Sequence, residues 1–215
     1  MKGITRRILV LSAAAATVAA ATVVPAPLAH ARTGRLLSSQ IGIQFDPDGD
    51  PGQCGGRTGE QWASAGNVTD VIRFDTDSRA GGCRLAFGLY DPQGELGGVS
   101  ATYTFRATPG GDPAQCGNQG THQLPITASR SFGAVIRIDT DNLQGGCDLT
   151  FALTSPTSTS IGVNYTSDGD RAQCGNAPLP PGGFSPVGND SAFPVRIDTD
   201  DRPGGCRLQL RLNLF

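Results

Sequence analysis

The chain has 215 residues with 30 Gly and 15 Pro, and its formal net charge at pH 7 is −2. This mild acidity, without a basic tract, excludes the electrostatic footprint of a nucleic-acid-binding protein, so we expect no nucleic acid among its partners. Scarce Glu, Lys and Met beside abundant Gly, Thr and Asp favour strands and turns over helices.

The N-terminus has the three parts of an export signal. A basic start with Arg6 and Arg7 precedes an uncharged apolar run over residues 8–24, and residues 29–31 read Ala-His-Ala, a small-x-small cleavage pattern. We therefore predict a bacterial signal peptide over residues 1–31 and a secreted protein, with a membrane anchor as the alternative. Cleavage would leave a net charge of about −5, because the removed segment holds three basic residues and no acidic one. No later stretch approaches the length and apolarity of a membrane span, so we expect none in the mature chain.

After a polar lead-in over residues 32–40, the chain repeats one pattern three times. In each copy a Gln-Cys-Gly sequence comes first, an Arg-x-Asp-Thr-Asp sequence follows, and a Gly-Gly-Cys sequence comes last. We place the three repeats at residues 41–91, 99–154 and 161–215.

Each repeat opens on a segment with the period of a half-buried strand. Residues 41–45, 101–105 and 161–165 alternate apolar and polar side chains and end on an aromatic residue. A Gly-Asp loop and the first cysteine follow, and then comes the segment that differs most between the copies. We expect that segment to be a surface loop, with a short edge strand in the first two repeats. Its prolines exclude a central strand in the third repeat.

Two further strands are predicted on either side of the Gly-Gly that precedes the second cysteine. In the first repeat Ile72 and Phe74 share one face, with Arg73 on the other, while Cys83 and Leu85 share a face of the next strand. We expect these two strands to pair as a hairpin. Three strands with one apolar face are marginal alone. We therefore predict an all-β fold in which three disulfide-stapled repeats, of about three strands each, form one compact pseudo-threefold domain. Three small β beads are the alternative.

Six cysteines in an exported chain imply disulfides. Each repeat holds two of them, which favours pairing within the repeats. The predicted pairs are Cys54–Cys83, Cys116–Cys147 and Cys174–Cys206. A rival pattern would link neighbouring repeats through Cys83–Cys116, Cys147–Cys174 and Cys54–Cys206. A zinc site is not expected, because no two cysteines are closely spaced.

The residue inventory argues against catalysis. His122 is the only histidine after residue 31, and the other two repeats have none at the matching place. Acyl transfer needs a base that a third group holds in position. Lysine is absent after residue 31, and paired cysteines have no thiol chemistry. A pair of aspartates for glycoside hydrolysis would need unlike environments, which a repeated motif does not offer. We therefore predict that the protein is not an enzyme.

Aspartates of the repeated pattern are the candidate metal ligands. If the predicted disulfides form, the Gly-Asp loop and the Asp-Thr-Asp sequence of each repeat would converge, and hard oxygen ligands are what Ca²⁺ takes. The tentative ligands are Asp50, Asp75 and Asp77; Asp112, Asp139 and Asp141; and Asp170, Asp198 and Asp200. The structural alternative is favoured, because an arginine accompanies every copy: the first aspartate then pairs with that arginine and the second caps a turn. Calcium is the one cofactor that the sequence suggests.

Binding residues are predicted where the copies differ, because varied loops on a constant frame are a common way to build binding surfaces. They are Trp62, Arg79, His122, Leu143, Phe184 and Arg202. For Trp62, a place in the core of the first repeat is the alternative. We expect a secreted protein-binding module, an adaptor or an inhibitor, whose partner is another extracellular protein. A multivalent glycan-binding protein is the first alternative, and a structural cell-surface protein is the second.

Overall fold

The computed structural model describes residues 38–75, 81–139, 145–175, 183–189, 191–198 and 204–214. Residues 35–215 form one compact unit. Within the described residues the secondary structure consists of β-strands and three short 3₁₀ helices, without an α-helix. The predicted all-β class is therefore confirmed. The predicted signal peptide lies outside the described residues, as do six predicted site residues: Asp77, Arg79, Asp141, Leu143, Asp200 and Arg202.

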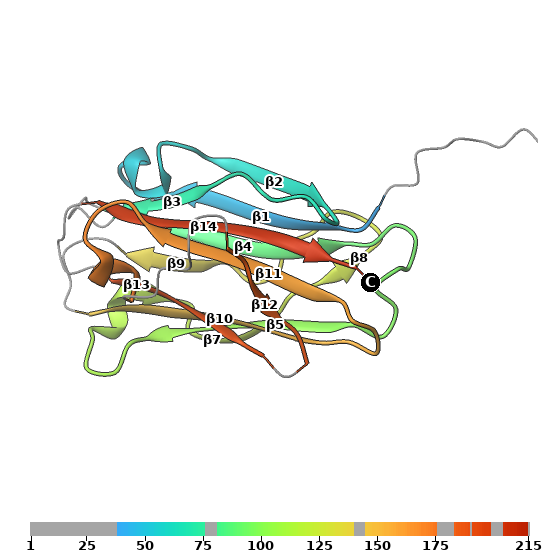
Figure 1. Cartoon of the computed structure of the whole chain (residues 1–215). Helices are drawn as coiled ribbons and strands as arrows, with labels where there is room; N and C mark the ends of the chain where they lie inside the picture. Colours follow the sequence, from blue (N-terminus) through green and yellow to red (C-terminus); the bar gives the residue numbers. More distant parts are fainter. Residues whose placement is uncertain are drawn as a thin grey trace, which may run out of the picture. The chain divides into compact units, whose positions relative to one another are not determined.

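The strands form three sheets, whose members can be followed in Figure 1. Sheet A has the order β2-β1-β4-β9-β6, with β8 beside β4. Its strands are β1 Gln40–Pro47, β2 Gly59–Ser64, β4 Gly82–Tyr90, β6 Cys116–Gly117, β8 Ile126–Thr127 and β9 Ile136–Asp139. Sheet B has the order β12-β11-β14-β3. Its strands are β3 Ile72–Asp75, β11 Ser160–Ser167, β12 Ser185–Val187 and β14 Gly205–Asn213. Sheet C has the order β13-β10-β5-β7. Its strands are β5 Ser100–Ala107, β7 Gly120–Gln123, β10 Gly146–Thr154 and β13 Phe193–Asp198.

One pairing scheme recurs in the three sheets. The opening strand of each repeat pairs antiparallel with the Gly-Cys strand of the same repeat, as β1 with β4, β5 with β10 and β11 with β14. The variable segment then supplies an edge strand, β2, β7 or β12. We expected edge strands in the first two repeats, and the third has one as well.

The strand that carries the Arg-x-Asp sequence pairs with a different repeat. Strand β9 of the second repeat lies on β4 of the first, β13 of the third lies on β10 of the second, and β3 of the first lies on β14 of the third. The expected hairpin within each repeat is therefore wrong. The alternation of apolar residues determines which face of a strand is buried, but it does not determine which strand lies alongside. This exchange joins the three repeats through strand pairing, whereas separate beads would share no paired strands.

The sheets share one hydrophobic core. The predicted inward residues Ile72, Phe74, Cys83 and Leu85 are all at most 2% exposed. Aromatic rings cross between the repeats, because Phe87 of β4 packs edge-on against Tyr103 of β5 and Phe151 of β10, with ring centroids 5.2 and 5.0 Å apart. Such edge-to-face pairs add to the stabilisation that burial provides.

Three disulfides lie within the repeats: Cys54–Cys83, Cys116–Cys147 and Cys174–Cys206. The predicted pairing is confirmed, and the rival pattern between repeats is wrong. The first cysteine of each pair lies in or directly after a 3₁₀ helix. These helices are η1 Pro51–Cys54, η2 Pro113–Gln115 and η3 Arg171–Cys174. Each disulfide therefore ties a short turn to the Gly-Cys strand of its own repeat.

Candidate functional site

The aspartates of the Gly-Asp loops cap the three 3₁₀ helices. Asp50 accepts a hydrogen bond from the Gly52 N–H at 2.7 Å. Asp112 and Asp170 do the same for the backbone N–H groups two residues on, each at 2.9 Å. An aspartate in this position satisfies a donor that the start of a helix leaves open. The structure thus gives these three predicted calcium ligands a structural contact.

The aspartates of the Arg-x-Asp-Thr-Asp motif are described in part. Asp139 forms an ion pair with Arg137 on the same strand, as the structural alternative predicts. For Asp75 and Asp198 the strand is described but not the side chain. Within the described part of the chain, no group of three or more His, Cys, Asp or Glu residues is placed to hold a metal ion. The calcium site stays a prediction, because the second aspartate of each motif lies outside that part.

Where β4 meets the exchanged strand β9, a carboxylate lies between two arginines; we call this contact the sheet A junction. Arg84 and Arg137 are directly opposite each other in the strand register. Asp48 pairs with Arg137 at 2.5 Å and with Arg84 at 3.0 Å, and it accepts a hydrogen bond from the Gly82 N–H at 2.6 Å. Two like charges opposite each other destabilise a sheet, so the carboxylate offsets a repulsion that the pairing creates.

The sheet B junction, where β14 meets β3, has the same construction. Arg207 lies opposite Arg73. Asp168 pairs with Arg73 at 2.6 Å and with Arg207 at 3.0 Å. Asp168 therefore bridges β3, the exchanged strand of the first repeat, to β14, the last strand of the chain.

The sheet C junction, where β10 meets β13, has an aspartate in place of one facing arginine and a threonine in place of the bridging aspartate. Asp148 lies opposite Arg196, so the facing pair already has opposite signs. Thr108 stands where the other junctions have their bridging aspartate, and its hydroxyl accepts a hydrogen bond from the Gly146 N–H at 3.1 Å. A neutral acceptor is sufficient there, because no pair of like charges needs a counterion.

The bridging carboxylates of the other two junctions have lowered pKa values. Burial by itself raises the pKa of Asp48, but the hydrogen bond and charge of Arg137, the Gly82 N–H and the charge of Arg84 outweigh it. The net pKa lies below the ordinary value of 3.8. Asp168 shows the same balance: burial raises its pKa, but the hydrogen bond and charge of Arg73, the charge of Arg207 and the Gly205 N–H outweigh it, so the net pKa is lowered. Both groups are therefore held as anions, which is the form that a structural ion pair requires.

Of the predicted binding residues, Trp62 packs within the molecule. A Cβ atom at Gly42 would come within 2.5 Å of its ring, so glycine is needed beneath it. The Phe132 ring lies 4.9 Å away, and the guanidinium carbon of Arg130 lies 5.6 Å from the indole centroid. Arg130 also donates a hydrogen bond to Gln40 at 2.8 Å. Trp62 is half-buried and joins β2 to a segment of the second repeat, so it is not a member of the hydrophobic core.

The other two described binding candidates also have intramolecular neighbours. The guanidinium carbon of Arg211 lies 4.5 Å from the centre of the Phe184 ring. The His122 ring lies on Tyr103 with centroids 5.3 Å apart, and its Nε2 is 2.8 Å from the Asn118 carbonyl oxygen. Trp62, Phe184 and His122 lie in three different sheets or their borders. The structure does not gather them into one site.

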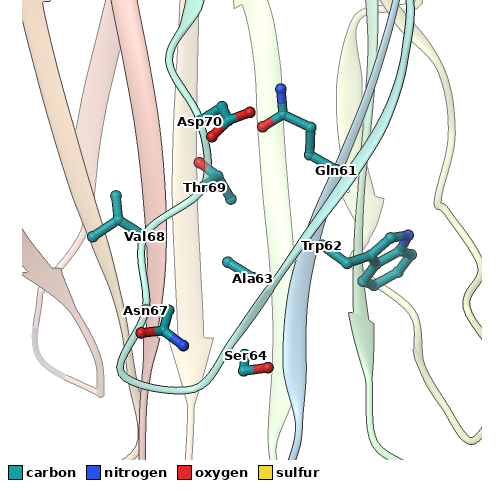
Figure 2. A pocket seen from close by; sticks show the side chains of 8 residues that line it. All are labelled: Gln61, Trp62, Ala63, Ser64, Asn67, Val68, Thr69 and Asp70. Carbon is teal, nitrogen blue, oxygen red and sulfur yellow. The ribbon is translucent and has the colours of Figure 1, made fainter.

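A groove of about 440 Å³ opens between β2 and residues 67–70. No sequence pattern predicted this groove, because residues 67–70 have no strand period and no counterpart in the other repeats. Five of its lining residues are polar: Gln61, Ser64, Asn67, Thr69 and Asp70. Figure 2 shows β2 and the segment of residues 67–70 as two arms that meet in a turn, with Gln61 and Asp70 facing each other and the Trp62 ring directed away. The volume lies in the range of about 300–1,000 Å³ that is usual for ligand sites.

Comparison of the chain with models of protein families, with curated proteins and with solved structures finds no match. Among the residues that the structure describes, no helix is long and apolar enough to cross a membrane.

Proposed function

We propose that the mature chain is exported and works by binding another extracellular protein, without catalysing a reaction. The observation that carries this proposal is the groove beside β2, which has an uncharged polar residue at half of its lining positions and is built on a disulfide-braced frame. Three disulfides are what an oxidising, extracellular environment allows a chain to keep. A rigid frame lowers the entropy that a binding site loses when it takes up a partner.

The arrangement favours a protein partner over a glycan. Sugar recognition commonly uses an aromatic ring that is free to stack, and Trp62 already packs on Gly42, Phe132 and Arg130. Catalysis has little to support it: His122 stacks on Tyr103, and all six cysteines are paired.

The test is to immobilise the oxidised mature chain and to pass the producer's culture fluid over it. We expect a specific protein to be retained, and we expect that protein, once purified, to rebind with saturable one-to-one stoichiometry. Chain reduced and alkylated before immobilisation is the control, since it should retain nothing specific. Saturable binding on a glycan array, without any protein ligand, would instead establish the carbohydrate alternative.

A further inference from the structure

The edge of sheet A beside the groove carries backbone groups that are directed outward. The Ala65 N–H donates to the Ser39 carbonyl at 2.8 Å, which sets the alternation of hydrogen-bonded pairs between β1 and β2. Counting back by two residues, Ala63 and Gln61 face β1 in the same way. Glu60 and Trp62 fall between them, so their N–H and C=O groups are directed away from β1. Strand β2 is the last strand on this side of sheet A.

The opposite wall of the groove has the same property. Val68 forms an isolated antiparallel bridge with Arg211. The Thr69 N–H donates to the Leu210 carbonyl at 2.9 Å, and the side chain of Gln209 donates to the Thr69 carbonyl at 3.0 Å. Because Thr69 directs its backbone toward β14, the N–H and C=O of its neighbour Val68 are directed to the other side, which is the side of the groove.

Side chains at the groove match a polar, basic segment. Asp70 lines the groove, and its side chain is 73% exposed. Glu60 lies outside the lining, exposed at the start of β2 on the face that Trp62 shares, where it would neighbour a side chain of an added strand. Asp70 pairs with Arg57 at 3.8 Å, an exposed contact that a ligand cation can displace at little cost. Farther in, the buried Oε1 atom of Gln61 has no hydrogen-bond partner within the described residues. Val68, which is 39% exposed, adds apolar surface.

We propose that the groove takes an extended, basic segment of the partner protein as an added β-strand between β2 and residues 67–70. The added strand would complete the hydrogen bonds of Glu60 and Trp62 on one wall and of Val68 on the other. This is the mode in which main-chain bonds give affinity and alternate side chains give specificity. The inference rests on the proposed function, since it names how the protein partner is held.

The first test uses proline on the edge strand. Glu60→Pro removes an outward N–H, yet it takes no hydrogen bond from β1, and proline is tolerated at such an edge position. The matched control is Thr121→Pro on β7, the edge strand of sheet C. There the Leu124 N–H donates to Ala101, which places Thr121 among the outward residues as well. Circular dichroism should show that both variants are folded.

The probes are synthetic heptapeptides selected from a random display library on the oxidised mature chain. We expect the selected peptides to carry Lys or Arg, to bind at least 10-fold more weakly to Glu60→Pro, and to bind Thr121→Pro normally. Methylating the peptide backbone nitrogens one at a time should weaken binding at least 10-fold at alternate residues only, because strand pairing has a period of two. Replacing both Glu60 and Asp70 by their amides should weaken binding and reduce its dependence on salt.

Several results would overturn the inference. Methylation effects without the two-residue period, equal binding to both proline variants, or a library that yields no peptide would each do so. A dimer of the chain that Glu60→Pro abolishes would make a second copy the occupant. If a partner protein from culture fluid binds Glu60→Pro as well as the parent, strand addition is wrong while the binding function stands. If no protein binds and glycans do, the function itself is wrong.

Discussion

At the scale of single residues, the three junctions show that the charges of the two facing residues determine whether the bridging residue is an aspartate or a neutral threonine. The sheet A and sheet B junctions place two arginines opposite each other and add an aspartate. The sheet C junction has Asp148 opposite Arg196, and there the bridging position is occupied by Thr108. Each junction reaches a local balance of charge. Because β3, β9 and β13 all present an arginine at this position, the charges stabilise the exchanged pairing without distinguishing one exchanged strand from another.

We predict that Asp48→Asn destabilises the protein at pH 7 by about 1–3 kcal/mol, the range for loss of a charge-assisted hydrogen bond at a largely buried group. The folded-state pKa of Asp48 is lowered, so its contribution is complete above the unfolded value near 3.8 and is lost as pH falls through the folded value. The stability difference between parent and variant should therefore shrink below about pH 4. Urea unfolding, measured from pH 7 to pH 3, gives both quantities.

The matched control for this measurement is Asp46→Asn. Asp46 lies two residues away and also faces Arg84, but at 3.7 Å, and its side chain is 53% exposed. An exposed pair contributes about 0–1 kcal/mol, so this variant should unfold nearly as the parent does. If Asp48→Asn has the same small effect at every pH, the bridging role of Asp48 is wrong.

At the scale of strands and turns, sequence periodicity and cysteine position carried different information. Alternation correctly located the buried faces around Ile72 and Phe74, and one cysteine pair per repeat correctly gave the disulfides. The hairpin was wrong because pairing across repeats and pairing within a repeat bury the same side chains. The groove was missed for a different reason: it lies beside the backbone of an edge strand, and the outward direction of backbone N–H and C=O groups does not depend on residue type.

A chain cleaved between two repeats tests both kinds of link. Exchanged strands should hold the fragments together in native buffer, whereas disulfides within the repeats should not hold them together in detergent. Residues 156–158 are exposed in the connection between the second and third repeats, so a protease site can be placed there. After cleavage we expect the two fragments to elute together in gel filtration, because β13 stays on β10 and β3 stays on β14. In detergent without reductant they should separate, since no disulfide crosses the cut.

The same cut distinguishes the alternatives. Fragments that stay joined in detergent until a reductant is added would show disulfides between repeats. Fragments that separate in native buffer would show that strand exchange contributes little, as expected for independent beads. A chain with a protease site inserted but left uncleaved controls for the insertion itself.

At the scale of the whole molecule, the exchange closes on itself, because the first repeat gives β3 to the last strand of the chain. The two ends of the described chain also meet at one turn. The Ala65 N–H donates to the Ser39 carbonyl, and the next N–H, that of Gly66, donates to the Leu212 carbonyl, each at 2.8 Å. Because the arrangement is closed and its ends are adjacent, the chain termini can be moved from between the third and first repeats to another connection between repeats.

We therefore predict that a circular permutant folds. Its termini are joined by a Gly-Ser linker of about six residues, and its new ends are placed within residues 156–158. All strand pairs are kept, so its free energy of unfolding should lie within about 2 kcal/mol of the parent, a difference set by loop closure. Deletion of residues 155–215 should instead abolish cooperative unfolding, because β10 loses β13 and β3 loses β14. Urea unfolding followed by circular dichroism compares the three chains. A truncated chain as stable as the parent, or a permutant that does not fold, would mean that the exchanged strands are not what holds the repeats together.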